Sequence, residues 1–483
     1  MALSVSSNND DGEAGDEPLS DGSDVILDPA SRLALERKSE EERAEARRRR
    51  RQEIMEKHGV HADHAHAPKK ARKTSKSMPA EANASKDAFA EMTAEAGLDM
   101  FSAHPEVGAS NGVDAPESTC DHDAPAALKD NWNDEEGYYK ARAGEVMHGR
   151  YKVLGMNGKG VFSTVMFATD AQSGNDVAIK LIRDNETMRR AAEKEMRLLK
   201  DIADADPAKK FNCIQLLDTF EHRQHICMVF EPMSMNMRET VNKFGRKVGI
   251  SLGAVRAYTR QLFVALCLLK RVGIIHADLK PDNILITKDL SRVKICDFGS
   301  AFKADDPDNV ETPYLVSRFY RAPEIVLGLP YNHSIDTWGI ATCVYEFFTG
   351  RIMFPGRTNN HMLSLMQSSL QGKFPNKMIR KHISVYNEKF EKEAHFQSDY
   401  KFRQYEIDPV TKRTVLRVVT IHEAPSESMG KRLARSSSSE SSERRAVAQF
   451  ADLLSKTLSL DPARRMTCED SLRHPFCKTN QTK

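Results

Sequence analysis

With 483 residues, of which 40% are hydrophobic, the chain can bury a sizeable core, and its formal net charge is only +2. No apolar run reaches the roughly 18 residues of a membrane span, the N-terminus lacks the apolar core of a signal peptide, and the eight cysteines include no Cys-x-x-Cys pair. These features argue against a membrane protein, a secreted disulfide framework and a zinc or redox pair, so we expect a soluble intracellular protein.

The first 128 residues are predicted to be a disordered, charged tail. Residues 1–28 hold eight acidic side chains and no Lys or Arg, and residues 31–57 favour at most a solvated helix. Four histidines, at 58, 61, 64 and 66, could bind a metal, but their small and polar neighbours favour disorder. Residues 69–76 form a basic patch, which can be a nuclear-import signal, a nucleic-acid contact or plain solvated charge.

Order is expected to begin near Trp132, in a segment whose three aromatic residues are predicted to dock on the domain that follows. Residues 151–165 then predict a strand, a glycine-rich turn and a second strand. Gly158 and Gly160 would let the backbone N–H groups of the turn approach phosphates closely. The matching pattern is Gly-x-Gly-x-x-Gly-x-Val, with Ser163 in place of the third glycine and Val165 at its end.

A β-prone strand at 177–180 ends in a single lysine, Lys180. Downstream, apolar residues recur at intervals that place them on one face of a helix, and a carboxylate, Glu195, interrupts that face. The positions of this face are Met188, Ala192, Glu195, Leu199 and Ile202. A lone buried charge is costly, so Glu195 should pair with Lys180; the alternative is a partly solvated glutamate at the edge of the apolar stripe.

Further elements follow in chain order. Strands are predicted at 213–217 and 226–230, and the second strand runs into Glu231-Pro232-Met233. From Ser251 the apolar periodicity is that of a long helix. Its apolar positions are Val255, Leu262, Leu266 and Leu269. More helix is expected at 336–348 and 444–460.

The most informative stretch is 276–324. A short apolar strand at 284–286 separates two acidic loops, so Asp278 and Asn283 of the first can be brought beside Asp297 of the second. Three converging oxygen-bearing side chains of this kind can hold a hard cation and orient a hydroxyl group.

Residues 378–445 are predicted to be an insert. Tyr405 and Ile407 alternate, a turn follows at 408–409, and Leu416 and Val418 alternate again, which indicates a hairpin. The serine-rich tract at 435–444 could be phosphorylated or could be an unmodified flexible surface loop.

Several motifs resemble those of the pre-mRNA-processing kinases of the CMGC group, relatives of the DYRK and CLK kinases. They are HADLKPDN at 276–283, DFG at 297–299, TPYLVSRFYRAPE at 312–324, FPGRTNNHM at 354–362 and PNKMIRK at 375–381. The similarity runs from about residue 131 to residue 476. Departures from the family pattern are Ser163 in the glycine-rich turn, and Gly339 with Ala341. The second pair raises a question about local helix packing rather than about chemistry.

The resemblance implies the α+β class with the bilobal protein-kinase fold. In that fold an N-lobe antiparallel sheet plus the αC helix faces a mainly helical C-lobe, here with a disordered N-terminal tail. The expected domains are the tail at 1–128, an ordered extension at 129–150, the kinase domain at 151–477 with the insert at 378–445, and a C-terminal tail at 478–483. The resemblance also implies that Arg465 pairs with Glu324.

The resemblance implies an ATP site as well. Lys180, held by Glu195, would lie on the α- and β-phosphates. Backbone groups of Glu231 and Met233 would bind adenine, while Phe230 would guard the back of the pocket. Gly158, Gly160, Val165 and Ala178 complete the expected nucleotide contacts.

Catalytic roles follow from the same resemblance. Asn283 and Asp297 would bind Mg²⁺, Asp278 would orient the substrate hydroxyl and accept its proton, and Lys280 would neutralise charge on the transferring phosphoryl group. Tyr314 stands where DYRK-type kinases phosphorylate their own activation segment. The alternative is an unmodified tyrosine packed under that segment.

The expected function is therefore that of a protein serine/threonine kinase that acts on pre-mRNA splicing (spliceosomal) proteins. We expect a monomer in the nucleus, with protein substrates, no membrane partner, and RNA or a nuclear-import receptor as possible contacts of the basic tail. Three alternatives remain: a DYRK-like dual-specificity kinase outside splicing, a pseudokinase scaffold in nuclear ribonucleoprotein, and a nucleic-acid-binding protein. The basic patches on which the last alternative rests lack interleaved aromatic residues for base stacking.

Overall fold

The computed structural model describes residues 132–134, 137–160, 163–245, 248–306, 312–370, 373–390, 393–407, 414–420, 427–436 and 441–478. The predicted disordered tail, its histidine cluster and its basic patch lie outside these residues. Residues 405–417 group apart from the rest of the described chain.

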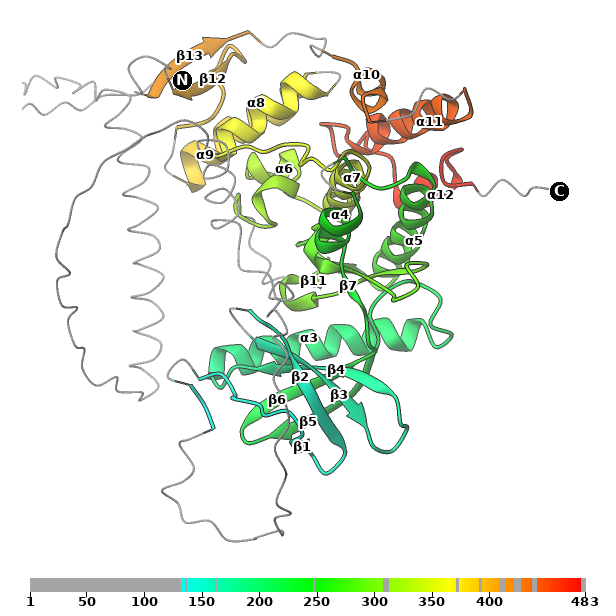
Figure 1. Ribbon diagram of the computed structural model, residues 1–483. Coiled ribbons are helices and arrows are strands. Elements are labelled where there is room, and N and C mark those ends of the chain that lie inside the picture. Colours follow the sequence, from blue (N-terminus) through cyan, green and yellow to red (C-terminus); the bar gives the residue numbers. More distant parts are fainter. Residues whose placement is uncertain are drawn as a thin grey trace, which may run out of the picture. The chain divides into compact units, whose positions relative to one another are not determined.

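An antiparallel sheet and one long helix form the N-terminal lobe (Figure 1). The sheet has the strand order β1-β2-β3-β4-β6-β5. Its strands are β1 (Val146–Met147), β2 (Tyr151–Lys159), β3 (Ser163–Asp170), β4 (Asp176–Ile182), β5 (Leu216–His222) and β6 (His225–Phe230). The register sets Val165 opposite Lys180, and Ala178 opposite Phe230, so three adjacent strands bring these side chains together.

The helix of this lobe is α3 (Glu186–Ala205). It begins at Asn185, whose side-chain oxygen accepts hydrogen bonds from the backbone N–H groups of Thr187 and Met188, as an N-cap does. Its buried face consists of Ala192, Glu195, Leu198, Leu199 and Ile202. The predicted helix face is thus confirmed, with Leu198 added and Met188 only partly buried.

One predicted strand was misplaced. The strand expected at 213–217 is β5 at Leu216–His222, and Cys213 makes only an isolated bridge to Ile295. Cys213 and Ile214 are buried beside β10 (Val293–Ile295) of the C-terminal lobe, which explains their apolar character. In β5 the only buried residue is Phe220, so this strand carries little apolar pattern.

The C-terminal lobe is mainly helical. Its short strands are β7 (Met235–Asn236), β8 (Ile274–Ile275), β9 (Ile284–Ile286), β10 (Val293–Ile295) and β11 (Phe302–Lys303). Its helices are α4 (Met237–Gly245), α5 (Leu252–Arg271), α6 (Pro323–Val326), α7 (Ser334–Thr349), α8 (Asn359–Ser369), α9 (Asn376–Lys389), α10 (Met429–Ala434), α11 (Ser441–Thr457) and α12 (Cys468–Arg473). Single 3₁₀ turns are η2 (Pro281–Asn283), η3 (Phe298–Ser300) and η4 (Arg318–Tyr320).

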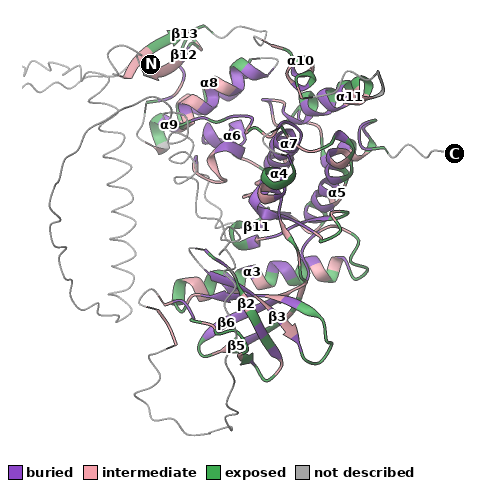
Figure 2. Cartoon of the chain, viewed as in Figure 1, coloured by how far each residue is buried: buried purple, intermediate pink, exposed green. Residues whose placement is uncertain are grey.

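Helices α5 and α7 are the centre of this lobe, as the buried colouring of Figure 2 shows. By length and hydropathy alone α5 could cross a membrane, but more than half of its apolar window is buried inside the protein, as in a core helix. In α7 every residue from Ile335 to Thr349 is buried. A Cβ added at Gly339 would lie 3.0 Å from Cβ of Leu279, so this departure from the family pattern accommodates the neighbouring catalytic loop.

The insert contains the predicted hairpin. Strands β12 (Phe402–Ile407) and β13 (Thr414–Val419) form a separate two-stranded sheet, which confirms the prediction. Two boundaries differ from expectation. The predicted start of the insert at residue 378 lies inside α9. Helix α11 begins at Ser441, so the last four residues of the predicted flexible serine tract are helical.

Candidate active site

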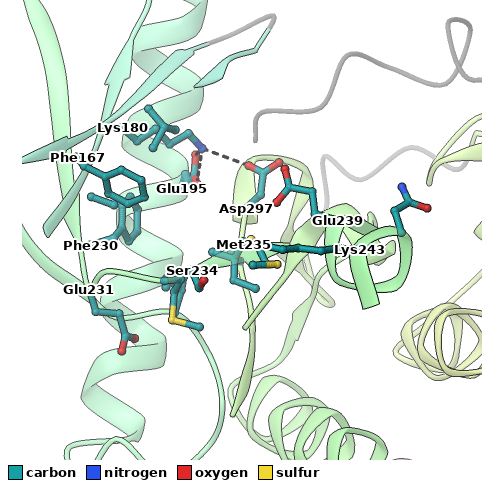
Figure 3. A pocket seen from close by; sticks show the side chains of 17 residues that line it. Phe167, Lys180, Glu195, Phe230, Glu231, Ser234, Met235, Glu239, Lys243 and Asp297 are labelled. Atoms are coloured by element: carbon teal, nitrogen blue, oxygen red, sulfur yellow. Dashed lines mark hydrogen bonds and ion pairs between the residues drawn. The ribbon is translucent and has the colours of Figure 1, made fainter. Parts of the chain in front are cut away.

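A lysine between two carboxylates forms the centre of the candidate site (Figure 3). Nζ of Lys180 lies 2.8 and 2.9 Å from the two carboxylate oxygens of Glu195, and 3.2 Å from Oδ1 of Asp297. The three residues come from β4, α3 and the loop after β10. The predicted Lys180–Glu195 ion pair is therefore confirmed, and it is joined by Asp297.

The three groups differ in how strongly they hold charge. Burial disfavours the ammonium form of Lys180, but attraction to Glu195 and Asp297 outweighs it and raises the pKa of the lysine. Burial also disfavours the charged form of Glu195, and this raises the pKa of its carboxyl group. For Asp297 burial acts in the same direction, yet the adjacent Lys180 ammonium prevails and lowers its pKa. The cluster thus holds an ionised aspartate with 28% of its side chain exposed.

The catalytic-loop residues gather around Asp278. The amide nitrogen of Asn283 donates to the backbone oxygen of Asp278 at 2.9 Å and to its Oδ2 at 3.2 Å, and Nζ of Lys280 lies 3.4 Å from the same Oδ2. The other oxygen, Oδ1, accepts the hydroxyl of Ser317 at 2.7 Å. Asp278 therefore already holds an alcohol group at hydrogen-bond distance, with a cation beside it.

Buried groups behind the loop fix its backbone. The Asp336 carboxylate, near the start of α7, accepts the N–H groups of His276 and Ala277 at 2.8 and 3.0 Å. The His276 ring donates from Nε2 to the Cys296 carbonyl at 2.9 Å. Because Cys296 directly precedes Asp297, this contact links the loop that carries Asp278 to the one that carries Asp297.

A second ionic cluster lies under the same loop and has no counterpart in the sequence predictions. The Arg238 guanidinium, from α4, donates to both Asp282 oxygens at 2.6 and 2.9 Å, to Glu346 at 2.8 Å and to the Tyr320 hydroxyl at 2.7 Å. Asp282 lies within the catalytic motif, between Lys280 and Asn283. The cluster therefore ties that motif to α7 and to η4.

A cavity of about 540 Å³ opens beside Lys180. Its lining includes five of the predicted nucleotide contacts and the expected back-pocket residue: Val165, Ala178, Lys180, Glu231, Met233 and Phe230. The Glu231 side chain is held by Lys294 Nζ at 2.6 and 2.7 Å and points away from Lys180 (Figure 3). Any role of Glu231 in the cavity is therefore left to its backbone.

The two predicted glycines are not part of that lining. Gly158 pairs with Val165 across β2 and β3, and the N–H of Gly160 donates to the Ser163 carbonyl at 2.9 Å. Ser163 is fully buried and completes this turn, as expected for a small residue at that position.

The activation segment is organised around Arg321, which is 9% exposed. Its guanidinium donates to the carbonyl oxygens of Leu315, Val316 and Tyr314 and to Oδ1 of Asn359, at 2.8 to 3.3 Å. The Tyr314 ring centroid lies 5.7 Å from the guanidinium carbon. Val316, a β-branched residue, has φ of 67°, a strained backbone held by these bonds.

Two further clusters lie in the C-terminal lobe. Arg465 makes the predicted pair with Glu324, at 2.6 and 2.8 Å, with both side chains wholly buried. Cys267, Cys468 and Glu469 bring their ligand atoms within 4.8 Å of one another, a potential metal-binding group. The sequence could not show it, because Cys267 and Cys468 are distant in the chain; Lys270 already neutralises Glu469 at 2.9 Å.

Comparison with known proteins places this geometry in a family. The model of the protein kinase domain matches residues 151–477. The Schizosaccharomyces pombe serine/threonine-protein kinase prp4 is 44% identical over 351 residues, which is 73% of this chain and 71% of that protein. The chain belongs to the Prp4-type serine/threonine-protein kinases.

Other Prp4-type and related kinases are similar over nearly the same share of this chain. The Dictyostelium discoideum serine/threonine-protein kinase prpf4B is 42% identical over 73% of this chain but only 42% of its own length. The dual specificity protein kinase lkh1 of S. pombe is 31% identical over 74% of this chain and 51% of its own length. These matches confirm the predicted relation to the pre-mRNA-processing kinases and to their DYRK and CLK relatives, and they confirm the bilobal kinase fold.

Proposed function

We propose that this protein kinase transfers the γ-phosphoryl group of ATP to serine and threonine hydroxyls of pre-mRNA splicing proteins. The observation that supports it most is the convergence of Lys180, Glu195 and Asp297 at a cavity, together with an Asp278 carboxylate that accepts an alcohol on a loop linked to Asp297 through His276 and Cys296. Phosphoryl transfer needs little covalent chemistry from the protein and depends on positioned charges of this kind.

The nucleotide would occupy the cavity beside Lys180. Its apolar wall, with Val165, Ala178 and Leu285, suits a flat base, and the backbones of Glu231 and Met233 at the β6–β7 connection would supply polar contacts. Lys180, held in place by Glu195, would then neutralise phosphate charge. Gly158 and Gly160 would contribute through the shape of the β2–β3 turn.

The donor set near Asp297 fits a magnesium ion. An ionised carboxylate and the amide oxygen of Asn283 are the hard oxygen ligands that Mg²⁺ prefers. Asn283 donates through its nitrogen to Asp278, which leaves its oxygen as the atom suited to a cation. When bound, Mg²⁺ would neutralise charge on the phosphates.

In this proposal Asp278 positions the substrate hydroxyl and receives its proton. Lys280, 3.4 Å from Oδ2, would stabilise negative charge that develops on the transferred group. Asn283 keeps Asp278 oriented through its two hydrogen bonds, and Ser317 occupies the other oxygen until a substrate hydroxyl arrives. No residue of the protein needs to form a covalent intermediate.

Radiolabelled ATP and a generic basic protein substrate test the enzyme directly. Asp278→Asn should lower the rate by about a hundredfold or more, as expected when one positioned charged group is lost. Asp289→Asn is a matched control, because Asp289 makes only local turn contacts at the surface. An inactive wild type would favour a pseudokinase scaffold, and an Asp278→Asn variant as active as an active wild type would contradict the role given to Asp278.

The splicing assignment follows the names and similarity of the Prp4-type relatives. Phosphoproteomics soon after acute inhibition of the kinase in cells would test it. Enrichment of spliceosomal proteins among the lost phosphosites is expected, and a set without them would favour a DYRK-like role outside splicing.

We further propose a monomer that enters the nucleus through its basic tail, whose residues 69–76 lie outside the described part of the chain. Comparing residues 129–483 with the full chain separates tail from kinase domain. Activity should be unchanged and nuclear accumulation should be lost. Salt-dependent RNA binding by residues 1–128 would instead assign the patch to RNA.

A further inference from the structure

The segment that precedes the kinase domain folds into a tight N-terminal hairpin, residues 132–134 and 137–140. The backbones of Asn133 and Tyr139 form an antiparallel bridge. The N–H of Lys140 donates to the Trp132 carbonyl at 2.8 Å, and that of Asp134 donates to the Tyr138 carbonyl at 2.9 Å. The segment therefore has a defined conformation of its own.

The N-terminal hairpin contacts the lobe at two places, the β5–β6 region and the segment just before α3. The Arg223 guanidinium, from the β5–β6 turn, lies 3.2 Å from the centroid of the Trp132 ring, and the His225 ring contacts the Asn133 side chain at 2.8 Å. The N–H of Asp184, just before α3, donates to the Gly137 carbonyl at 3.1 Å. The hairpin thus contacts the segment that leads into α3, the helix that carries Glu195.

From this base, Tyr138 reaches the glycine-rich turn. Its hydroxyl donates to the Gly160 carbonyl at 2.9 Å, in a buried hydrogen bond between residues 22 positions apart. Its ring lies under Lys159, whose Nζ is 4.0 Å from the ring centroid and 2.8 Å from a carboxylate oxygen of Asp134. Two consecutive residues of the turn are therefore held by the N-terminal hairpin.

We propose that Tyr138 is a positioning residue of the kinase, which holds the glycine-rich turn at Lys159 and Gly160 in the conformation that binds the nucleotide phosphates. Glycine gives the turn the freedom to approach phosphates, but the same freedom makes its ordered state costly in entropy. Both backbone groups of Gly160 have partners, Ser163 through the N–H and Tyr138 through the carbonyl. An external hydrogen bond of this kind orders the turn before ATP arrives.

The inference rests on the proposed ATP site and concerns how that site is kept in order. The nucleotide does not touch Tyr138 in this proposal, because the tyrosine acts on the turn from the hairpin side. It predicts a loss in ATP affinity with chemistry at saturating ATP largely retained.

The full-length Tyr138→Phe variant tests the proposal, since it removes one hydroxyl and keeps the ring. The KM for ATP should rise roughly threefold to tenfold, the effect of one hydrogen bond, with kcat changed by less than about twofold. Amide hydrogen exchange should accelerate in peptides that contain residues 158–165. A structural role alone would not confine faster exchange to this turn.

Tyr139→Phe is the matched control. It makes the same chemical change one residue along, where the buried hydroxyl donates to Glu145 and contacts His222 instead of the turn. It should leave the KM for ATP and the exchange of the turn as in wild type. Unchanged exchange in Tyr138→Phe, or the same change in both variants, would overturn the proposal. Hydrogen exchange requires no phosphoryl transfer, so this result stands even if the enzyme assignment fails.

Discussion

Two ion pairs in this kinase are buried to a similar extent, yet they differ in what surrounds them. Arg465 and Glu324 are wholly inaccessible, and the arginine also donates to the carbonyls of Ser334 and Ser459. Lys180 and Glu195 are almost as buried, at 7% and 5% exposure of their side chains, but they line a cavity and share their charge with a partly exposed Asp297.

The difference separates a structural pair from a functional one. A closed pair whose every partner is protein can only hold elements together, here the start of α6 and the segment before α12. An open cluster with two carboxylates and one lysine carries excess negative charge towards a cavity, which suits a bound cation. Buried ion pairs add little net stability by themselves, so the open cluster is best explained by its chemistry.

The largest expected effect is on activity at the open cluster. Lys180→Met and Asp297→Ala should each lower kcat about a hundred- to thousandfold, the loss of one charged clamp on the phosphates. The thermal midpoint should fall less than it does when the closed pair is broken, because the cluster borders a cavity that water can enter. Lys152→Met, an exposed lysine on β2, is the control for the loss of a positive charge. More than a tenth of wild-type turnover in either variant would count against the assigned roles.

The closed pair should behave in the opposite way. Arg465→Met strands the Glu324 carboxylate in the core, and the free energy of unfolding should fall by about 3–5 kcal/mol. Removing both charges, with Glu324→Met added, should recover much of that loss. Arg190→Met is the control, since its pair with Glu186 is exposed and contributes well under about 1 kcal/mol. Chemical denaturation measures all three, and equal losses for Arg465→Met and Arg190→Met would contradict the comparison.

Both pairs could be predicted from sequence, for different reasons. Glu195 interrupts an apolar helix face, and a buried carboxylate requires a cation, for which the lysine that ends a strand is the natural candidate. The pair of Arg465 with Glu324 came from the resemblance, because residues so far apart carry no local signal.

For other residues of the site, the sequence carries no signal of their contacts. Arg238 follows a stretch in which methionines alternate with polar residues, a pattern that does not indicate an ion pair, yet its partners Asp282, Tyr320 and Glu346 are all buried. Asp336 lies within a predicted helix, and nothing in the sequence marks it as the residue that holds the catalytic loop by two hydrogen bonds to its backbone. A sequence pattern shows only the neighbours of a residue along the chain, whereas these contacts depend on how separate elements pack.

A buried histidine extends the comparison to pH. Burial lowers the pKa of His382 to about 4, although its hydrogen bond to the Leu327 carbonyl acts in the opposite direction. An unfolded histidine titrates near 6.5, so between about pH 6.5 and 4 the unfolded chain takes up a proton that the folded one refuses. Stability should therefore fall as the pH drops through this window, by roughly 3 kcal/mol from this residue.

Denaturation at pH 7.5 and pH 5 measures the part of this loss above pH 5, about 2 kcal/mol. His382→Gln should show a smaller fall in stability between the two pH values than wild type does. The exposed His148, changed in His148→Gln, should leave the wild-type pH dependence intact. A His382→Gln protein as sensitive to acid as wild type would show that other groups account for the effect.

Arg321 is a third kind of buried cation, and it motivates the smallest expected effect. All its hydrogen bonds described above go to neutral oxygens, and burial together with the nearby Arg318 lowers its pKa to about 10. A phosphate on the neighbouring Tyr314 would supply an anion near both arginines, with roughly 1.5–3 kcal/mol for each hydrogen bond to a charged group. We therefore propose that the enzyme phosphorylates Tyr314 and thereby stabilises the activation segment.

Because the unmodified segment is already held through the four oxygens that Arg321 binds, phosphorylation should reinforce it rather than create it. Tyr314→Phe should therefore lower activity by no more than about tenfold, the weak end of the range for a hydrogen bond to a charged group. Mass spectrometry of protein made in bacteria should find phosphate on Tyr314 in wild type and none in Lys180→Met, which cannot modify itself. Tyr400→Phe controls for loss of a tyrosine elsewhere in the same lobe. An active wild-type enzyme with unmodified Tyr314 would refute the proposal and leave the tyrosine as a packing residue beside Arg321.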